Sequence, residues 1–360
     1  MQRCKQTASL LLLLPLLLIS CTKSSPTDNV DPTDTIKQRG TRQIIIDLNE
    51  AEGESFSETL AAAQGVGASG SNLSVAWDEL ETAPGVYEPT IDFLAIAESY
   101  FPAVNIPILL MIGPIDTNVE RLPSDLKGKA LDDPEVIDRY KKLLDHVFTK
   151  IPTLALDGIA LGNEVDVYLG ADTAAWGAYT RLYEAAAAHV RTIRPNLPIG
   201  VKVRLEGLTG PFATQATRLN QGSDVILATH YPLTDGRVHP PSGIRTDFAA
   251  LVARYPNRPI RLAELGYPSS STNGSSEQMQ ADFIRESFAA WDEQIDHITA
   301  ISFSIMSDRS QAEVEEYGRY YGLDEISFLE FLRTLGLRNH DGTPKPAFTQ
   351  LGKEAEKRGW

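Results

Sequence analysis

Two glutamates of this chain stand directly at the end of apolar runs. Glu164 closes the run DGIALGNE, and Glu264 closes the run IRLAE. A carboxylate at the rigid end of an apolar strand is unfavourable unless it is paired or used in chemistry. Two such groups in one site suit the cleavage of a glycosidic bond, in which one carboxylic acid protonates the leaving oxygen and one carboxylate faces the developing oxocarbenium ion. A structural role stays open at this point, because each glutamate could instead cap a helix or pair with Arg204 or Arg261.

The elements that must position these glutamates alternate regularly along the chain. From residue 41 on, short apolar runs alternate with segments of helical periodicity. Strands are predicted at residues 43–48, 72–77, 106–112, 158–162, 199–205, 224–230, 260–264 and 299–305, and the clearest helices at 134–148, 172–193, 276–291 and 326–335. Strands that are each followed by a helix predict an α/β fold, a (β/α)₈ TIM barrel, over residues 41–360.

A doubly wound open sheet is the competing architecture, which periodicity alone does not exclude. Its nucleotide-binding versions lose their main support, because no G-x-G-x-x-G follows the first strand and no G-x-x-x-x-G-K-[ST] occurs anywhere.

In a TIM barrel, chemistry sits where the strands end and the following loops begin. The predicted strand ends place several polar and aromatic side chains near the glutamates: Trp77, Asn163, Arg204, His230 and Tyr231. Lys202 and Arg204 alternate with apolar neighbours whose face should meet the helices, so Arg204 is expected to point inward.

Several of these segments resemble clan A of the glycoside hydrolases. Gly162-Asn163-Glu164 is similar to the fourth-strand motif in which an Asn-Glu pair carries the acid/base. The stretch ELGYPS, from Glu264 to Ser269, resembles the seventh-strand motif that carries the nucleophile, and especially the E-x-G-[WY]-P-S segment of family 17 β-1,3-glucanases. Weaker similarities lie at residues 77–87 (WDELETAPGVY), 229–231 (THY) and 336–347 (GLRNHDGTPKPA).

The resemblance implies a retaining glycoside hydrolase that cleaves β-linked oligo- or polysaccharides by double displacement. It implies that Glu164 is the acid/base and Glu264 the nucleophile, and that substrate contacts come from Trp77, Asn163, Arg204, His230, Tyr231 and Tyr267. Two features depart from the clan: residues 72–77 contain no arginine, and the eighth strand (ISFSIMSD) supplies no tryptophan. Arg204 is a candidate replacement for the missing cation. A lipid-anchored carbohydrate-binding protein on a catalytically inactive barrel is the alternative function.

Composition and charge exclude other classes. The chain carries 33 Lys and Arg against 48 Asp and Glu, a formal charge of −15, which argues against a nucleic-acid or anionic-surface partner. Two cysteines are too few for a thiolate zinc site, and the six histidines show neither H-x-H nor H-E-x-x-H spacing. No metal and no cofactor is therefore expected.

The N-terminus is typical of an exported protein. Arg3 and Lys5 precede an apolar run from Leu10 to Ile19, and the sequence LISC up to Cys21 resembles the bacterial lipobox. These features predict a signal peptide at residues 1–20, lipidation of Cys21, and a flexible tether that occupies the rest of residues 21–40. The protein would then be anchored by lipid in the bacterial cell envelope. An ordinary cleaved signal peptide with an incidental cysteine is the alternative.

Overall fold

The computed structural model of the chain describes residues 35–360. The predicted signal peptide, Cys21 and most of the predicted tether lie outside the described residues. The compact unit begins at Thr35, before the expected residue 41. Its first residues are held in place because the Arg39 amide donates to the Arg358 carbonyl at 2.7 Å, and the Arg42 guanidinium pairs with Asp292 at 2.8 Å. Within residues 35–360, no helix is both long and apolar enough to cross a membrane.

Parallel strands form the centre of the molecule. They are β1 Gln43–Ile46, β2 Ala68–Ala76, β3 Ile108–Gly113, β6 Leu156–Ala160, β7 Ile199–Gly200, β8 Lys202–Arg204, β9 Ile226–His230, β12 Ile260–Leu265 and β13 Ile298–Phe303. These nine segments pair in the order β7-β6-β3-β2-β1-β13-β12-β9-β8. Only Val201 separates β7 from β8, so the two are one barrel strand and the ring closes through them. The predicted (β/α)₈ barrel is confirmed.

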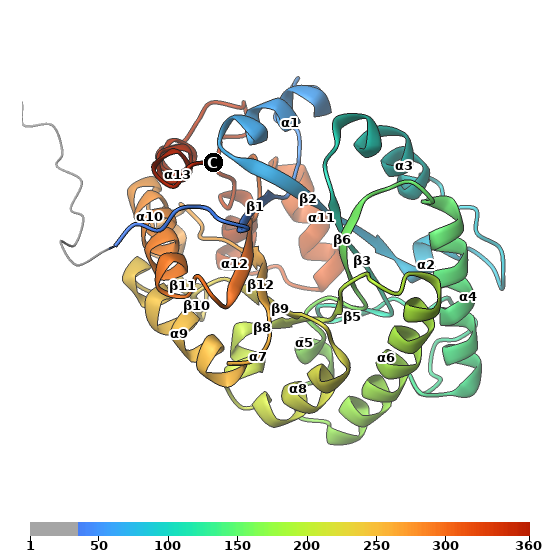
Figure 1. Cartoon of the computed structure of the whole chain (residues 1–360). Helices are drawn as coiled ribbons and strands as arrows, with labels where there is room; N and C mark the ends of the chain where they lie inside the picture. The colour runs from blue at the N-terminus through green and yellow to red at the C-terminus, as the bar shows by residue number, and fades with distance from the viewer. Residues whose placement is uncertain (1–34) are drawn as a thin grey trace, which may run out of the picture. The chain divides into compact units, whose positions relative to one another are not determined.

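A ring of helices covers the outside of this barrel, one after each strand (Figure 1). They are α1 Phe56–Gly65, α3 Phe93–Val104, α4 Pro134–Lys150, α6 Thr173–Ile193, α8 Ala213–Leu219, α9 Ile244–Arg254, α10 Glu277–Glu293 and α13 Pro346–Lys357. Local signals set their starts: Asp172 caps α6 by accepting from the Ala174 amide, and Ser276 caps α10 by accepting from the Met279 amide.

Shorter elements occupy the loops. The helices are α2 Trp77–Leu80, α5 Val165–Leu169, α7 Leu205–Thr209, α11 Gln311–Tyr321 and α12 Ile326–Arg333, with 3₁₀ turns at Asn220–Gly222, Pro241–Gly243 and Ser271–Asn273. Two small hairpins pair β4 Ile115–Asp116 with β5 Val119–Glu120, and β10 Leu233–Thr234 with β11 Arg237–Val238. In Figure 1, α11 and α12 appear inside the ring of outer helices, where they overlap the strands in this view.

The barrel interior is layered along the strands. An ion pair between Arg261 and Asp157, at 2.7 Å, precedes a small apolar cluster made of Leu109, Met111, Ala160, Val225, Leu227 and Ala263. Beyond that cluster the interior becomes polar. There the Asn72 amide donates to the Ala263 carbonyl at 3.2 Å and to the Asp47 carboxylate. The carboxyl ends of the strands therefore hold polar side chains on an apolar and rigid base.

Candidate active site

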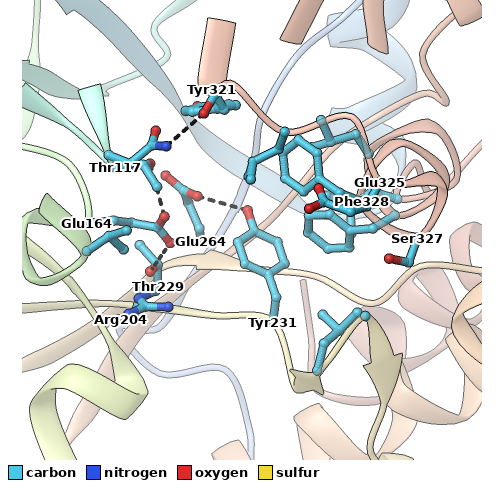
Figure 2. A pocket seen from close by; sticks show the side chains of 18 of the residues that line it. Thr117, Glu164, Arg204, Thr229, Tyr231, Glu264, Tyr321, Glu325, Ser327 and Phe328 are labelled. Carbon is cyan, nitrogen blue, oxygen red and sulfur yellow. Dashed lines mark hydrogen bonds between the residues drawn. The ribbon is translucent and has the colours of Figure 1, made fainter. Parts of the chain in front are cut away.

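Both glutamates line one cavity of about 800 Å³ at the carboxyl ends of the strands (Figure 2). Glu164 follows β6 and stands immediately before α5, whereas Glu264 lies within β12. Their side chains come from elements a hundred residues apart in the chain. The barrel thus brings together the two residues that the sequence singled out.

The backbone turns sharply just before Glu164. Gly162 has a φ of +145°, and a Cβ there would collide with the Tyr179 hydroxyl and with Val165. Glu164 itself has a φ of +41°, in the left-handed region that side chains other than glycine rarely adopt. This turn moves the chain out of the strand and directs the Glu164 carboxylate into the cavity.

Glu164 is 9 % exposed and accepts two hydrogen bonds from threonine hydroxyls. Thr229 donates to Oε1 at 2.6 Å, and Thr117 donates to Oε2 at 3.1 Å. Burial, followed by the negative charge of Glu264, raises the pKa of Glu164 to about 7, although the hydrogen bond from Thr229 acts in the opposite direction. A carboxylic acid with a pKa raised in this way is suited to donate a proton near neutral pH.

Glu264 is held by two donors, one on each carboxylate oxygen. The Lys202 ammonium donates to Oε1 at 2.8 Å, and the Tyr231 hydroxyl donates to Oε2 at 2.8 Å. Burial alone would lower the pKa of Lys202, but the charges of Glu264 and Asp47 raise it, so Lys202 stays a cation. The pair fixes the orientation of the Glu264 carboxylate.

Asp47 adds a third carboxylate behind Lys202. It accepts hydrogen bonds from Asn72, and from Ser304 at 3.0 Å. Burial, followed by the charge of Glu264, raises the pKa of Asp47 to about 6.

Sequence reasoning missed the role of Lys202. The alternation of polar and apolar residues along 201–205 was the available signal, but it placed Lys202 and Arg204 on the same inner face. The register shows their different depths, because Lys202 pairs with Leu227 of the apolar cluster and Arg204 pairs with Thr229 beside Glu164.

Arg204 lines the cavity but its ion-pair partner is Asp166, at 2.9 Å, rather than Glu264. The suggested replacement of the missing arginine by Arg204 is therefore wrong, because Lys202 occupies that position next to Glu264.

Asn163 also lines the cavity, and its amide donates to Asp116 at 2.8 Å. Its carbonyl oxygen Oδ1 is buried and has no hydrogen-bond partner among residues 35–360. A buried acceptor without a partner is unfavourable, so Asn163 is ready to accept a hydrogen bond from a bound molecule.

Trp77 and Tyr267 do not reach the cavity, so the prediction that they contact substrate is wrong. Trp77 is fully buried, and its indole N–H donates to Glu81 at 2.7 Å while its ring packs on Tyr140. Tyr267 is 2 % exposed and donates to the His239 carbonyl at 2.6 Å. Both rings are committed to the packing between the barrel and the outer elements.

The prediction for His230 is wrong for the same reason. His230 is 3 % exposed, with Nε2 at 2.9 Å from Asp247 and Nδ1 at 3.3 Å from Glu206. Burial would lower its pKa, but these two carboxylates raise it. Within the described chain, the cavity lining includes Tyr231, which directly follows β9, but not His230, the last residue of that strand.

The segment that contains α11 and α12 forms the other side of the cavity. It contributes Tyr321, Leu323, Glu325, Ser327, Phe328, Phe331, Leu332 and Leu335. Hydrogen bonds attach it to the barrel loops; for example, the Tyr320 hydroxyl donates to Asp116 at 2.7 Å, and the Asn118 amide donates to the Tyr321 carbonyl at 2.8 Å. Sequence reasoning predicted the helix at 326–335 but not its place at the site.

Among the described residues, no group of three or more His, Cys, Asp or Glu side chains is arranged to hold a metal ion.

No protein-family model and no curated protein matches this sequence. Solved structures do match it in fold. A GH5_18 protein from Bifidobacterium longum subsp. infantis has a TM-score of 0.65 at 14 % identity, over 88 % of this chain and 79 % of that one. A GH5_18 protein from Streptomyces cattleya, in complex with GlcNAc, has a TM-score of 0.64 at 13 % identity, and the match covers 90 % of this chain and 81 % of that one. The exo-beta-1,4-mannosidase Op5Man5 from Opitutaceae bacterium strain TAV5 has a TM-score of 0.66 at 15 % identity. The match covers 91 % of this chain but only 62 % of that protein. At these identities the likeness shows a shared barrel fold.

Proposed function

We propose that this protein is a retaining glycoside hydrolase, with Glu164 as acid/base and Glu264 as nucleophile, acting on β-linked oligo- or polysaccharides. The observation that carries the proposal is the contrast between two carboxylates in one cavity. Glu164 is buried with a pKa of about 7, whereas Glu264 is paired with the Lys202 ammonium at 2.8 Å. When two carboxyl groups in one site have different environments, one can keep its proton and act as the acid while the other is ionised and acts as the nucleophile. The glycosidase names of the structural neighbours support the same reaction class.

In the first step, Glu264 attacks the anomeric carbon while Glu164 gives its proton to the glycosidic oxygen, which leaves as an alcohol. Lys202 and Tyr231 hold the Glu264 carboxylate in a fixed orientation for this attack. The sugar is then esterified to Glu264, and its anomeric configuration is inverted once.

In the second step, Glu164 takes a proton from a water molecule that attacks the same carbon, which releases the sugar with retained configuration. The ester carries no negative charge, so the contribution of Glu264 to the raised pKa of Glu164 disappears. A lower pKa of Glu164 at this stage favours its role as base.

The test uses two glutamate variants on two kinds of substrate. Glu164→Ala should lower the rate by about 10²–10⁴ on glycosides whose leaving group needs a proton, and less on activated aryl glycosides. Azide should restore turnover of the aryl glycoside by this variant and give a glycosyl azide of retained configuration.

Glu264→Ala should abolish the retaining reaction on both kinds of substrate, while Glu356→Ala, a change at an exposed helical position, should keep the wild-type rate. Full activity of Glu264→Ala would contradict the assignment. Binding of glycans without any turnover would favour the carbohydrate-binding alternative.

We also propose that the protein is a lipoprotein of the bacterial cell envelope, anchored through Cys21. The lipobox-like sequence supports this placement, and the anchor would be the acyl chains.

A further inference from the structure

The cavity has two flanks of different chemistry. The barrel flank carries hydrogen-bonding groups, among them Glu164, Asn163 and Arg204. The opposite flank, here called the apolar flank, is mostly apolar: it contains Leu233, Leu323, Phe328, Phe331, Leu332 and Leu335, and Tyr321, Glu325 and Ser327 of the same segment also line the cavity. In Figure 2, Tyr231 lies between the glutamates and the labelled Phe328 of this flank.

The apolar flank is open to the cavity rather than closed by the protein's own packing. Although α12 has the apolar sequence ISFLEFLR, none of its residues is buried. Phe331 contacts Tyr231 edge to face, with ring centroids 5.2 Å apart, and Phe328 lies 6.4 Å from Phe331. A helix whose apolar side stays partly exposed at a cavity offers area that a ligand can remove from water.

The chemistry of this flank selects what can occupy it. Leucine and phenylalanine side chains provide no donor or acceptor, so a sugar hydroxyl pressed against them would lose its hydrogen bonds to water without replacement. The hydroxyl-rich part of a substrate therefore fits better on the barrel flank. The apolar flank fits a group without hydroxyls, such as an alkyl chain or an aryl ring.

We propose that the substrates are amphipathic glycosides, in which a sugar lies at the two glutamates and an apolar alcohol, the aglycone, lies against the apolar flank. This inference rests on the proposed function, because the aglycone oxygen is the one that Glu164 protonates. Hydrolysis breaks the bond between the anomeric carbon and that oxygen. Water supplies a hydroxyl to the sugar and a proton that returns to Glu164, and the products are the free sugar and the alcohol.

The test is an alkyl series at constant sugar. The Glu264→Gln variant is titrated calorimetrically with methyl, butyl, hexyl and octyl β-glycosides of glucose, galactose and mannose. Each glycoside is kept below its critical micelle concentration. The same series is assayed for hydrolysis by the wild-type protein. With the matching sugar, affinity and kcat/KM should each rise about two- to fourfold per added methylene until the flank is filled.

Variants of the flank provide the structural control. Phe331→Ala and Leu332→Ala should each flatten the dependence on chain length. Ile326→Ala should preserve it, because Ile326 lies on the same helix but is 71 % exposed and is not part of the cavity lining. Two flank variants are used because a single substitution could unfold the helix. A lowered Tm would reveal such a variant, and the other variant would still test the inference.

Any of three results would overturn the inference. They are equal binding of the methyl and octyl glycosides, tighter binding of a trisaccharide than of the octyl glycoside of the same sugar, and no binding of any member of the series. If binding depends on chain length but no member of the series is hydrolysed, the proposed function would be contradicted, while the proposed role of the apolar flank in binding would be supported.

Discussion

The hydroxyl of Thr229 offers a direct test of how the site sets the proton affinity of Glu164. Thr229 is fully buried in β9, and its hydroxyl donates to Glu164 at 2.6 Å. This hydrogen bond favours the ionised carboxylate and lowers its pKa, against burial and the charge of Glu264, which together raise the pKa to about 7. Thr229→Val replaces the hydroxyl with a methyl group of similar volume and removes only the hydrogen bond.

The size of the effect follows from the energy of that hydrogen bond. A hydrogen bond to a charged group contributes about 1.5–3 kcal/mol. Because one pKa unit corresponds to about 1.36 kcal/mol, the pKa of Glu164 should rise by about one to two units in Thr229→Val. The first step needs the protonated acid, so the alkaline limb of the kcat/KM profile should move to higher pH by the same amount.

The assay is the pH dependence of kcat/KM, from pH 4.5 to pH 10, on a glycoside whose leaving group needs protonation. Thr180→Val is the matched control, because Thr180 is also buried and donates to the Trp176 carbonyl of α6, away from the glutamates. This control should leave the limb in place. If Thr229→Val is folded and its alkaline limb stays put or moves to lower pH, either the hydroxyl does not tune Glu164 or Glu164 is not the acid.

Three further predictions concern stability and localisation. Since the pKa of Glu164 rises from 4.5 to about 7 on folding, the stability that its proton contributes is fully present below pH 4.5 and is lost as the pH rises through 7. Glu164→Gln should therefore gain roughly 2–3 kcal/mol in unfolding free energy relative to wild type between pH 5 and pH 8, measured by urea denaturation, and an equal difference at both values would contradict this. Lys202→Met leaves Glu264 without its buried partner and should cost about 3–5 kcal/mol at pH 7 and most of the activity, with partial recovery in Lys202→Arg; a stable, active Lys202→Met would exclude the role given to this pair. Cys21→Ala should move the protein from the membrane to the soluble fraction without changing its Tm, and a variant that still sediments with membranes in high salt would refute the lipid anchor.

Much of the barrel could be predicted because its signals are local. Buried parallel strands appear as short apolar runs, and the helices that follow them begin at good capping residues such as Asp172 and Ser276. The predicted strand at 199–205 is interrupted at Val201, but the two halves keep the place of one strand in the ring. Strand ends located by this pattern also identified Glu164 and Glu264.

What could not be predicted depends on contacts between distant segments. Trp77, His230 and Tyr267 stand near strand ends, yet each side chain faces outward to partners supplied elsewhere in the chain. The helix at Ile326–Arg333 has a clear periodicity, but its position at the cavity depends on hydrogen bonds such as that of Tyr320 to Asp116, 204 residues earlier in the chain. No local pattern encodes such a contact.

The charged groups around the site bear on its affinity for a proton. Among the charged groups at this end of the barrel are the carboxylates Asp47, Glu164, Asp166 and Glu264 and the cations Lys202 and Arg204. Arg204 is matched to Asp166, and Lys202 to Glu264, so the two remaining acids have no cation of their own. Burial raises the pKa of both, to about 6 for Asp47 and about 7 for Glu164, and it also raises the pKa of Asp166, although Arg204 acts against that shift. Negative charge on these acids would also stabilise the positive charge that develops on a sugar at the transition state. The negative charge of Glu264 thus raises the pKa of the proton donor and would also favour the oxocarbenium ion.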